Sequence, residues 1–442
     1  MSEFHINIPA GQNRRLLTGG TYCPSDIQVT AQACVIEKDV NFYDYDGTLL
    51  HSYTVEEAQV LSALPPLPEH DGLVCQGWNW TLDAIRALTR PMTIGAMYIT
   101  DDGATRLYIS IPKNSRRTIP LYFSQTMQHG VMLDWGDGCT ETLEGTGTVS
   151  TSHDYANHGD YTIRLIPQPG CEMLLGGNAT GIGIFGAVTD TSSATHYLQN
   201  MLVRAELGSQ ISAVSTCAFY YCTSLSSITI PSGILGINAD AFRHCAALYC
   251  VIIPSGLSNG IGQFAFFCNY ALSILSFPHT TGNLISSSEF QGCSGLVTVD
   301  IPDAVAEIGW STLRDCNSLR KINKSSSTKL LASCCRYCRS LVEAAIGHGA
   351  STIGTYQFDG CHSLSNVVIT SPIQRIESLA FNNCYAMTEY DFTASTSVPT
   401  LENVNAFSNI PADCVIKVPA ELYAEWVGAT NWSVYADHIL GV

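Results

Sequence analysis

Closely spaced cysteines are the first residues in this 442-residue sequence whose types and spacing could do chemistry. Cys334, Cys335 and Cys338 stand in the order C-C-x-x-C, and thiolates at such a spacing are typical zinc ligands. A fourth ligand at the right spacing is missing, so His348 or His362 would have to approach through the fold. We favour burial of these thiols over zinc binding, because a repeat that runs through this region gives two of them the places of core residues.

A pair of carboxylates, Asp44 and Asp46, lies in the string D-Y-D-G-T of residues 44–48. The string resembles the first motif of haloacid-dehalogenase-type phosphatases, and the resemblance implies that Asp44 attacks phosphorus while Asp46 acts as general acid beside Mg²⁺. Such an enzyme needs a continuous apolar strand before the first Asp, but residues 38–43 alternate between polar and apolar types. Asp-Gly between strand-like segments is a strong hairpin signal. We therefore interpret the string as a turn and keep a Mg-dependent phosphatase as a remote alternative.

An internal repeat dominates the second half of the sequence. One copy reads A-F-Y-Y-C-T-S-L over residues 218–225, and the next reads A-F-R-H-C-A-A-L over residues 241–248, 23 residues later. Eight copies are recognisable. Phe, Cys and Leu three residues apart indicate one face of a short helical or 3₁₀ turn, and the I-x-I-P segment that follows alternates like a short strand. Stacked copies predict a solenoid with a core of Phe, Cys, Leu and Ile.

This pattern resembles the BspA-type leucine-rich repeat over roughly residues 205–415. The resemblance implies a binding or adhesion surface rather than catalysis, in a bacterial surface protein or in a structural protein of a phage or prophage. The end of the chain is similar to the C-terminal cap of such arrays. A strand at 415–419 and a helix at 420–427 would place Trp426 and Trp432 over the open end of the core.

The first half contains a second recognisable pattern. V-M-L-D-W-G-D-G at 131–138 is followed by S-H-D-Y at 152–155 and G-D-Y-T-I at 159–163. Together these segments resemble PKD-like β-sandwich modules, and the resemblance implies a spacer or a protein-contact domain. Asp134 and Asp137 could hold Ca²⁺, but turn formation explains them better.

Residues 1–90 indicate a small α+β module. The D-G turn separates two strands, and T-V-E-E at 54–57 is a capping box that begins a helix. The segment G-W-N-W at 77–80 carries two tryptophans. We expect both in the core of the module rather than on a carbohydrate-binding surface.

The composition argues against several classes of function. A formal net charge of −17 leaves nothing to neutralise a nucleic-acid backbone, and without an apolar run of about 18 residues we expect no membrane insertion. The N-terminus lacks the basic-then-apolar order of a secretory signal. Eighteen cysteines are many, but their periodic spacing favours small buried residues over a disulfide framework.

We therefore predict a mainly β protein with short helices, divided at residues 90, 168 and 414. The parts are a small α+β module at 1–90, a PKD-like β-sandwich at 91–168, BspA-type leucine-rich repeats at 169–414 and a C-terminal cap at 415–442. We expect no catalytic residue, no metal and no cofactor. The predicted function is non-enzymatic binding or adhesion to an unidentified protein or glycan, at the cell surface or outside the cell. The alternative is a structural tail or fibre component of a phage or prophage particle.

Strand alternation locates the predicted binding surface. Positions between the buried strand residues should point outward on one face of the solenoid sheet, and this face changes from apolar to acidic along the chain. The predicted contact residues are Thr229, Ile252, Ile274, Thr298, Asp300, Lys321, Asn323, Glu343, Asn366, Glu389 and Asp391.

Overall fold

The structure is a computed structural model that describes residues 35, 37–177, 181–187, 197–278, 284–285 and 287–442. The chain divides into two compact units, residues 1–36 and residues 37–442. The first part of the predicted N-terminal module lies outside the described residues, and the fold below is that of the second unit.

The D-x-D-G-T string forms the turn of a β-hairpin, as predicted. β1 (Val40–Tyr43) and β2 (Leu49–Tyr53) pair in antiparallel fashion. The Asp44 amide donates to the Thr48 carbonyl at 2.8 Å, and the Gly47 amide donates to the Asp44 carbonyl at 3.0 Å. Gly47 has a φ of +86°, a conformation that glycine adopts without steric cost.

The hairpin belongs to a four-stranded sheet with the order β2-β1-β4-β3. The first helix begins at the predicted capping box, in which Thr54 and Glu57 exchange hydrogen bonds between side chain and backbone. Trp78 and Trp80 are buried in the core of this module, as predicted. The sheet extends to Thr100, beyond the predicted boundary at residue 90. The further elements are α1 (Val55–Gln59), β3 (Leu73–Trp78), α2 (Leu82–Arg86) and β4 (Met92–Thr100).

A β-sandwich follows this module. One sheet has the order β15-β14-β5-β10-β7-β8, and the other has the order β11-β6-β9. Inward side chains of both sheets, among them Leu107, Leu121 and Trp135, share one hydrophobic core. The PKD-like character of the sandwich stays a prediction. Its strands are β5 (Thr105–Ile111), β6 (Thr118–Gln125), β7 (Val131–Asp134), β8 (Thr140–Thr142), β9 (Gly147–Asp154), β10 (Gly159–Pro167) and β11 (Met173–Leu175), followed by the small hairpin of β12 (Ile182–Gly183) and β13 (Gly186–Ala187).

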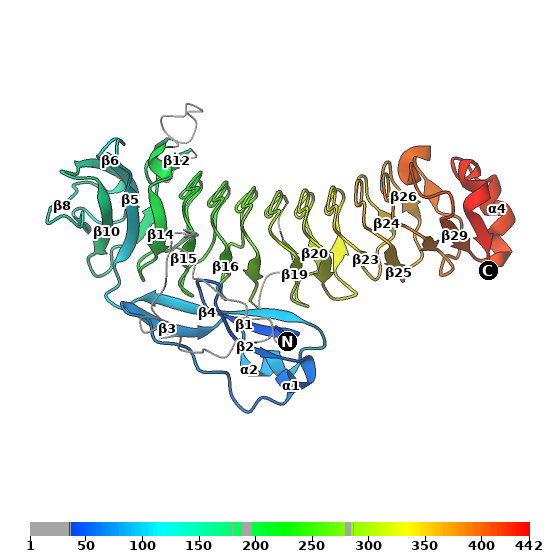
Figure 1. Cartoon of the computed structure of the whole chain (residues 1–442), viewed down its shortest axis with the longest axis horizontal. Coiled ribbons are helices and arrows are strands. Elements are labelled where there is room, and N and C mark those ends of the chain that lie inside the picture. Colours follow the sequence, from blue (N-terminus) through cyan, green and yellow to red (C-terminus); the bar gives the residue numbers. More distant parts are fainter. Residues whose placement is uncertain (1–34, 36, 178–180, 188–196, 279–283, 286) are drawn as a thin grey trace, which may run out of the picture. The chain divides into compact units, whose positions relative to one another are not determined.

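The larger sheet of the sandwich continues into the solenoid. β5 pairs antiparallel with β14 (Leu202–Glu206), and β14 pairs parallel with β15 (Ser227–Thr229), the first repeat strand. Buried residues of the sandwich and of the first repeats belong to the same hydrophobic core. The sandwich therefore covers the N-terminal end of the repeat array (Figure 1).

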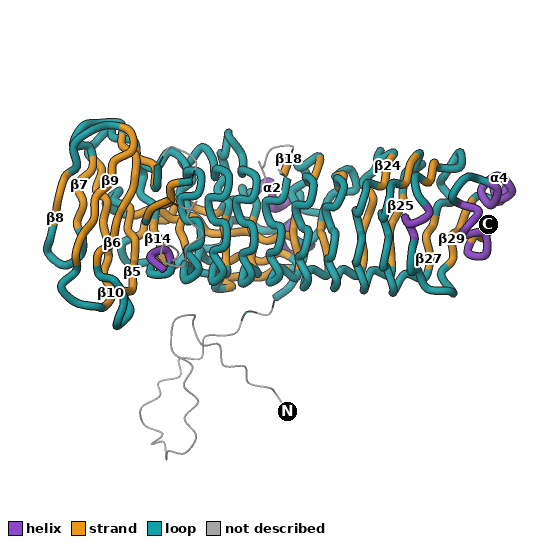
Figure 2. Tube along the Cα trace, turned by 90° about the horizontal axis from the view of Figure 1, so that it is seen from above, coloured by secondary structure: helices purple, strands orange, loops and turns teal. Residues whose placement is uncertain are grey.

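The repeats stack as parallel strands in two rows, which are seen from above in Figure 2. Pairing is in register, so Thr298 lies beside Lys321 and Glu343 lies beside Asn366. The first row comprises β15, β16 (Cys250–Ile252), β17 (Ile274–Ser276), β19 (Thr298–Asp300), β21 (Lys321–Asn323), β23 (Glu343–Ile346), β25 (Asn366–Ile369), β27 (Glu389–Asp391) and β29 (Val415–Val418). The second row comprises β18 (Leu284–Ile285), β20 (Glu307–Ile308), β22 (Lys329–Leu330), β24 (Thr352–Ile353), β26 (Arg375–Ile376) and β28 (Thr400–Leu401).

The A-F-x-x-C segments reverse the chain without forming a helix. Hydrogen bonds of the turn type are present, for example from the Arg243 amide to the Asp240 carbonyl at 3.2 Å. Asp240 and His244, however, have φ values of 56° and 61°. In later repeats Gly292 and Gly360 occupy the position equivalent to His244, also with positive φ. A left-handed residue every fourth position interrupts the helical run of dihedral angles. The predicted short helical turn is therefore a chain of linked turns.

Stacked rings fill the phenylalanine slot of the core. Phe219, Phe242 and Phe266 have ring centroids 5.1 and 5.2 Å apart, with planes inclined by 3° and 9°. The stack is interrupted where Leu313 and Cys335 occupy the slot, and it resumes beyond them. The repeat core predicted from the sequence is thus confirmed.

The cysteine slot forms a second ladder. The Cys245 thiol lies 3.1 Å from the carbonyl oxygen of Phe219 in the preceding repeat, and the Cys361 thiol lies 3.0 Å from that of Cys335. Each of these carbonyl oxygens already accepts one amide hydrogen bond. The thiol therefore donates to the second lone pair of the carbonyl oxygen, inside the core. Burial raises the pKa of the Cys245 thiol well above its ordinary value, which keeps the donor protonated. The same contact is made by Cys293, Cys316, Cys338 and Cys384.

The C-terminal cap is present as predicted. Trp426 and Trp432 are fully buried and pack against Phe392, and Trp432 also packs against Phe407. The Trp432 indole donates to the Pro399 carbonyl at 2.8 Å. These aromatic side chains close the end of the core. The cap comprises η1 (Val404–Phe407), η2 (Ala420–Leu422), α4 (Tyr423–Gly428), η3 (Trp432–His438) and β30 (Ile439–Gly441).

Candidate binding face of the solenoid

The outward side chains of the first strand row form the face that the sequence predicts as a binding surface. Ile252 and Ile274 belong to a hydrophobic cluster outside the solenoid core. Their neighbours Val251 and Leu275 belong to the core itself. The alternation of inward and outward residues is therefore confirmed on these strands.

The N-terminal sheet lies on the first half of this face. β4 contacts β15, β16 and β17, and the blue strands run alongside the green repeats in Figure 1. Tyr43 and Met97 of the module pack against Cys250, Ile252 and Ile274 of the solenoid. The two surfaces thus share a small apolar core of their own.

Gly95 lies directly against Ile252 where the two surfaces meet. A Cβ atom at this position would lie 2.3 Å from Cδ1 and 2.4 Å from Cγ2 of Ile252. Real carbon atoms do not come this close, so the isoleucine side chain occupies the space that any larger residue at position 95 would need.

Polar side chains of the module fix it on the face. Asn79 Nδ2 donates to the Ile253 carbonyl at 3.1 Å and to Ser276 Oγ at 2.9 Å. Trp80 Nε1 donates to the Phe277 carbonyl at 2.7 Å. These three hydrogen bonds give partners to polar groups that the contact buries.

A buried carboxylate lies at the far end of this contact. Thr93 Oγ1 donates to Asp300 Oδ2 at 2.6 Å, and Asn323 Nδ2 donates to Asp300 Oδ1 at 2.7 Å. Arg90 forms an ion pair with Asp303 at 2.8 Å. Burial raises the pKa of Asp300 above its ordinary value, although both hydrogen bonds and Arg90 favour the charged form.

This coverage corrects part of the predicted binding surface. Five of the eleven predicted contact residues are buried. The module packs on Ile252 and Ile274, and its strand β4 contacts β15, which carries Thr229. Asp300 accepts hydrogen bonds from Thr93 of the module and from Asn323. These five residues cannot touch a partner while the module is in place. The five are Thr229, Ile252, Ile274, Asp300 and Asn323.

The remaining predicted residues are exposed on the other half of the face. Thr298 lies at the margin of the module, and the rest lie beyond it. We call the uncovered part from β21 to β29 the open face. It consists of the outward residues Lys321, Glu343, Asn366, Val368, Glu389, Asp391 and Lys417.

Charges of both signs lie on the open face, and some of them form ion pairs. Lys321 pairs with Glu343 at 2.9 Å, and Lys417 pairs with Glu389 at 2.7 Å, each across strands of the first row. Asp391 accepts hydrogen bonds from the amide and hydroxyl of Thr393. Burial opposes ionisation of Asp391, but these hydrogen bonds outweigh it and lower its pKa. The open face therefore carries fixed charge at neutral pH.

The carboxylates of the D-x-D-G-T string are engaged inside the module. Asp44 is buried, accepts the Tyr45 amide at 2.9 Å and lies 2.8 Å from His70 Nε2. Asp46 is exposed and accepts the Thr48 amide at 2.9 Å. Turn and core contacts account for both groups without any catalytic role.

The thiols of the C-C-x-x-C segment are fully buried in the solenoid. Cys335 fills the phenylalanine slot, and the Cys338 thiol lies 3.0 Å from the Leu313 carbonyl oxygen. In the described ranges these thiols do not gather with other potential ligands closely enough to hold a metal ion. Their expected role as core residues fits this geometry.

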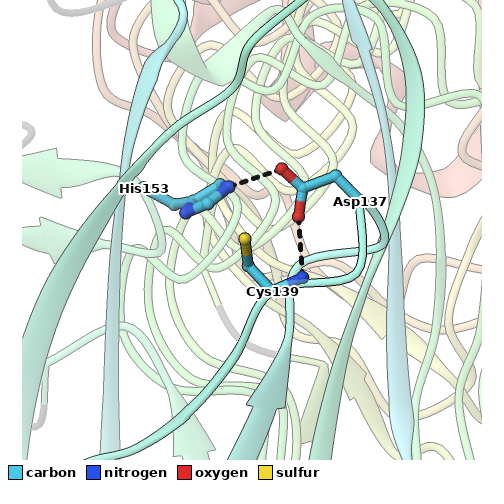
Figure 3. A group of neighbouring side chains, drawn as sticks. All are labelled: Asp137, Cys139 and His153. Carbon is cyan, nitrogen blue, oxygen red and sulfur yellow. Dashed lines mark hydrogen bonds and ion pairs between the residues drawn. The ribbon is translucent and has the colours of Figure 1, made fainter.

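One group of potential metal ligands lies elsewhere, at the edge of the β-sandwich. Asp137, Cys139 and His153 bring a carboxylate, a thiol and an imidazole together (Figure 3). From the sequence, Asp134 and Asp137 are possible Ca²⁺ ligands, but turn formation explains them better. Each of these carboxylates indeed accepts a backbone amide two residues ahead. The spacing D-G-C, with a histidine on a later strand, was the signal that could have pointed to the group.

The two strand rows, the ring stack and the capped ends define a leucine-rich-repeat solenoid, a class of protein that binds partners on an extended sheet face. The chain belongs to the BspA-type leucine-rich repeat family. The family's sequence pattern matches residues 193–320, 259–388 and 328–419. Together the matches cover residues 193–419, which is 227 of the 442 residues. The family that matches the chain is not a family of enzymes. No curated protein sequence matches the chain significantly.

Solved structures of bacterial leucine-rich repeat proteins are similar to the chain at low identity. A leucine-rich repeat protein from Bacteroides ovatus is 16% identical, covers 55% of this chain and 84% of its own, and has a TM-score of 0.30. A leucine-rich cell surface protein from Faecalibacterium prausnitzii is 21% identical, with coverage of 53% and 62% and a TM-score of 0.31. A leucine-rich repeat protein of T. pallidum is also 21% identical, with coverage of 49% and 82% and a TM-score of 0.25. Within the described ranges, every helix is too short or too polar to span a bilayer.

Proposed function

We propose that the protein is a non-enzymatic binding protein that contacts a protein partner through the open face, at the surface of a bacterial cell. One observation carries this proposal: among the described residues, the chain's own module covers the first half of the sheet face, and the second half carries exposed side chains. Membership of the BspA-type family supports a binding role and a surface location.

The chemistry of the open face favours a protein over a glycan. Its outward side chains are charged, amide or small apolar residues, and none on β21 to β29 is aromatic. Interstrand spacing of about 4.8 Å gives these five strands a width of roughly 20 Å. A strip of that size with charges of both signs suits the complementary charges of a protein surface, which steer encounter and fix register.

A binding screen followed by substitution tests the proposal. The full chain would be presented to arrays of extracellular proteins and of glycans, and the partner would be titrated by surface plasmon resonance. Asn366→Arg places a long charged side chain in the middle of the open face, and we expect it to weaken binding by at least about 10-fold. Thr352→Arg on β24 is the matched control, because it adds the same side chain to an exposed strand of the second row.

The outcomes distinguish the alternatives. Weakening by Asn366→Arg but not by Thr352→Arg supports the open face. Unchanged affinity in Asn366→Arg and in Glu389→Lys would place the binding site elsewhere. Capture of a glycan instead of a protein would contradict the class of partner proposed.

A further inference from the structure

The group of Asp137, Cys139 and His153 joins the two sheets of the β-sandwich. Asp137 and Cys139 lie in the turn between β7 and β8, on the larger sheet. His153 lies near the end of β9, on the smaller sheet. Figure 3 shows the three side chains pointing toward one another from these two elements.

The ligand atoms are already close together. His153 Nε2 lies 2.7 Å from Asp137 Oδ2, and all three ligand atoms lie within 4.8 Å of one another. The turn holds its two residues in place, because the Cys139 amide donates to Asp137 Oδ1 at 3.1 Å. Gly138 has a φ of +95°, which lets the chain turn back between them.

Aromatic side chains fix the imidazole. Trp135 stacks on His153 with ring centroids 5.0 Å apart and planes inclined by 17°, and Tyr155 meets the ring edge-on at 4.7 Å. Trp135 is itself held, because its indole donates to Glu141 at 3.0 Å. A ligand with so little freedom loses little entropy on binding.

We propose that Asp137, Cys139 and His153 form a binding site for Zn²⁺ or a transition-metal ion of similar preference, with water as the fourth ligand. Carboxylate, imidazole and thiolate are the ligands that zinc takes from proteins. Ca²⁺ and Mg²⁺ require sets of oxygen atoms, which this group does not provide. The side chains of His153 and Asp137 are 16% and 19% exposed and Cys139 is exposed, so an ion can reach the site from solvent.

Only small movements are needed to receive the ion. Ligand distances of about 2.0 to 2.3 Å in a tetrahedral zinc site place ligand atoms roughly 3.3 to 3.8 Å apart. Asp137 and His153 would therefore separate slightly from 2.7 Å, while the thiol already lies within 4.8 Å of both. All three residues are at the protein surface or partly exposed, which leaves room for these shifts.

Asp137 and Cys139 differ in whether they must lose a proton when an ion binds, because metal ligands bind in their deprotonated form. Burial opposes ionisation of Asp137, but hydrogen bonds from His153 and the Cys139 amide outweigh it and lower the pKa of that carboxyl. Desolvation, followed by the hydrogen bond with Asp137 and the charge of that carboxylate, raises the pKa of the exposed Cys139 thiol. A bound ion would take the place of the thiol proton, and because its ligands come from both sheets it would tie the turn after β7 to β9.

Cobalt substitution tests the site on the full chain. The protein would be stripped with a chelator, and Co²⁺ would be added while the absorption spectrum is recorded. We expect one equivalent to bind, with a thiolate-to-cobalt charge-transfer band and the intense visible bands of tetrahedral cobalt. Zn²⁺ should displace the colour at one equivalent. Cys139→Ser should abolish the charge-transfer band, and His153→Gln should weaken Zn²⁺ binding by at least about 100-fold.

Cys75→Ser is the matched control, because Cys75 is another exposed thiol outside the group. It should leave the band and the zinc affinity unchanged. Cys139 is exposed and its serine variant is expected to fold, which a circular dichroism spectrum checks. Absence of the charge-transfer band in the unmodified chain would overturn the site. Equal zinc affinity in the unmodified chain and in Cys139→Ser would also overturn it, since the ion would then be bound elsewhere.

Discussion

Gly95 of the N-terminal module lies directly against Ile252 of the solenoid, and its replacement tests the contact. In Gly95→Ala the added methyl group would meet Ile252 at 2.3 Å. The backbone at Gly95 is not left-handed, so alanine is compatible with its dihedral angles. The only expected conflict is with the isoleucine side chain.

The size of the effect follows from the atoms in conflict. The three atoms nearest the new Cβ all belong to Ile252, and two of them, Cγ2 and Cγ1, cannot move without turning the whole side chain. Overpacking of this kind costs about 1 to 3 kcal/mol. Ile252→Ala removes all three atoms, so the double variant should recover most of that cost as a coupling between the two sites.

The thiol of Cys250 reports on the contact. It is buried between the module and the sheet, where burial raises its pKa and protects it from alkylation. Weakening the contact by about 1 to 3 kcal/mol should speed its alkylation about 5-fold to about 150-fold, at 1.4 kcal/mol for each factor of ten. Peptide mass spectrometry would follow Cys250 together with Cys361, a thiol of the solenoid core whose rate should stay unchanged.

Two results would refute the reasoning. An unchanged rate at Cys250 in Gly95→Ala would mean that the module does not rest on this face. A rate that rises equally in Gly95→Ala and in Gly95→Ala/Ile252→Ala would mean that the effect does not come from the isoleucine.

Three further predictions concern the core, the buried carboxylate and the cap. Cys361→Ala removes the thiol that faces the Cys335 carbonyl, and we expect a loss of about 2 kcal/mol in the free energy of unfolding in urea, whereas Cys75→Ala should change little. Asp300 has a raised pKa in the folded protein, so its contribution to stability falls as pH rises from about 3.8 through that raised value. Asp300→Asn should therefore equal or exceed the unmodified chain in melting temperature at pH 7 and lose this advantage near pH 4, and a lower melting temperature at pH 7 would contradict this. Trp432→Ala opens the end of the core and should cost about 3 to 5 kcal/mol, with amide exchange rising first in β27 and β29; protection that is lost uniformly along the solenoid would contradict a local role.

The repeats were predictable because their signal is local and periodic. Phe242 and Cys245 recur with the same spacing in copy after copy, so chance agreement is excluded without any knowledge of the fold. The cap was predictable because its signal is also local: Trp426 and Trp432 come soon after β29, the last strand of the first row. The hairpin at Asp46 needed only its Asp-Gly pair.

The docking of the module could not be predicted from the alternation of inward and outward residues along the strands. Alternation assigns Ile252 to the outer side of its strand, and the structure agrees. What lies in front of that side depends on Gly95 and Asn79, which come from a distant part of the chain and carry no periodic signal. The left-handed turn residues were missed for another reason. Asp240 and His244 adopt positive φ values although most residue types at these positions are not glycine, so spacing alone favoured a helix.

The continuous sheet between sandwich and solenoid has a consequence for self-association. A stack of parallel strands with a bare first strand offers unpaired amides and carbonyls to the end of another stack, which is a route to fibres. Here the first repeat strand, β15, is paired with β14. The edge strand at the other end of the same sheet is β8, which has only three residues and carries Glu141 at its centre. A short, charged edge is a poor template for strand addition. The sandwich thereby closes the N-terminal end of the ladder against the addition of further strands.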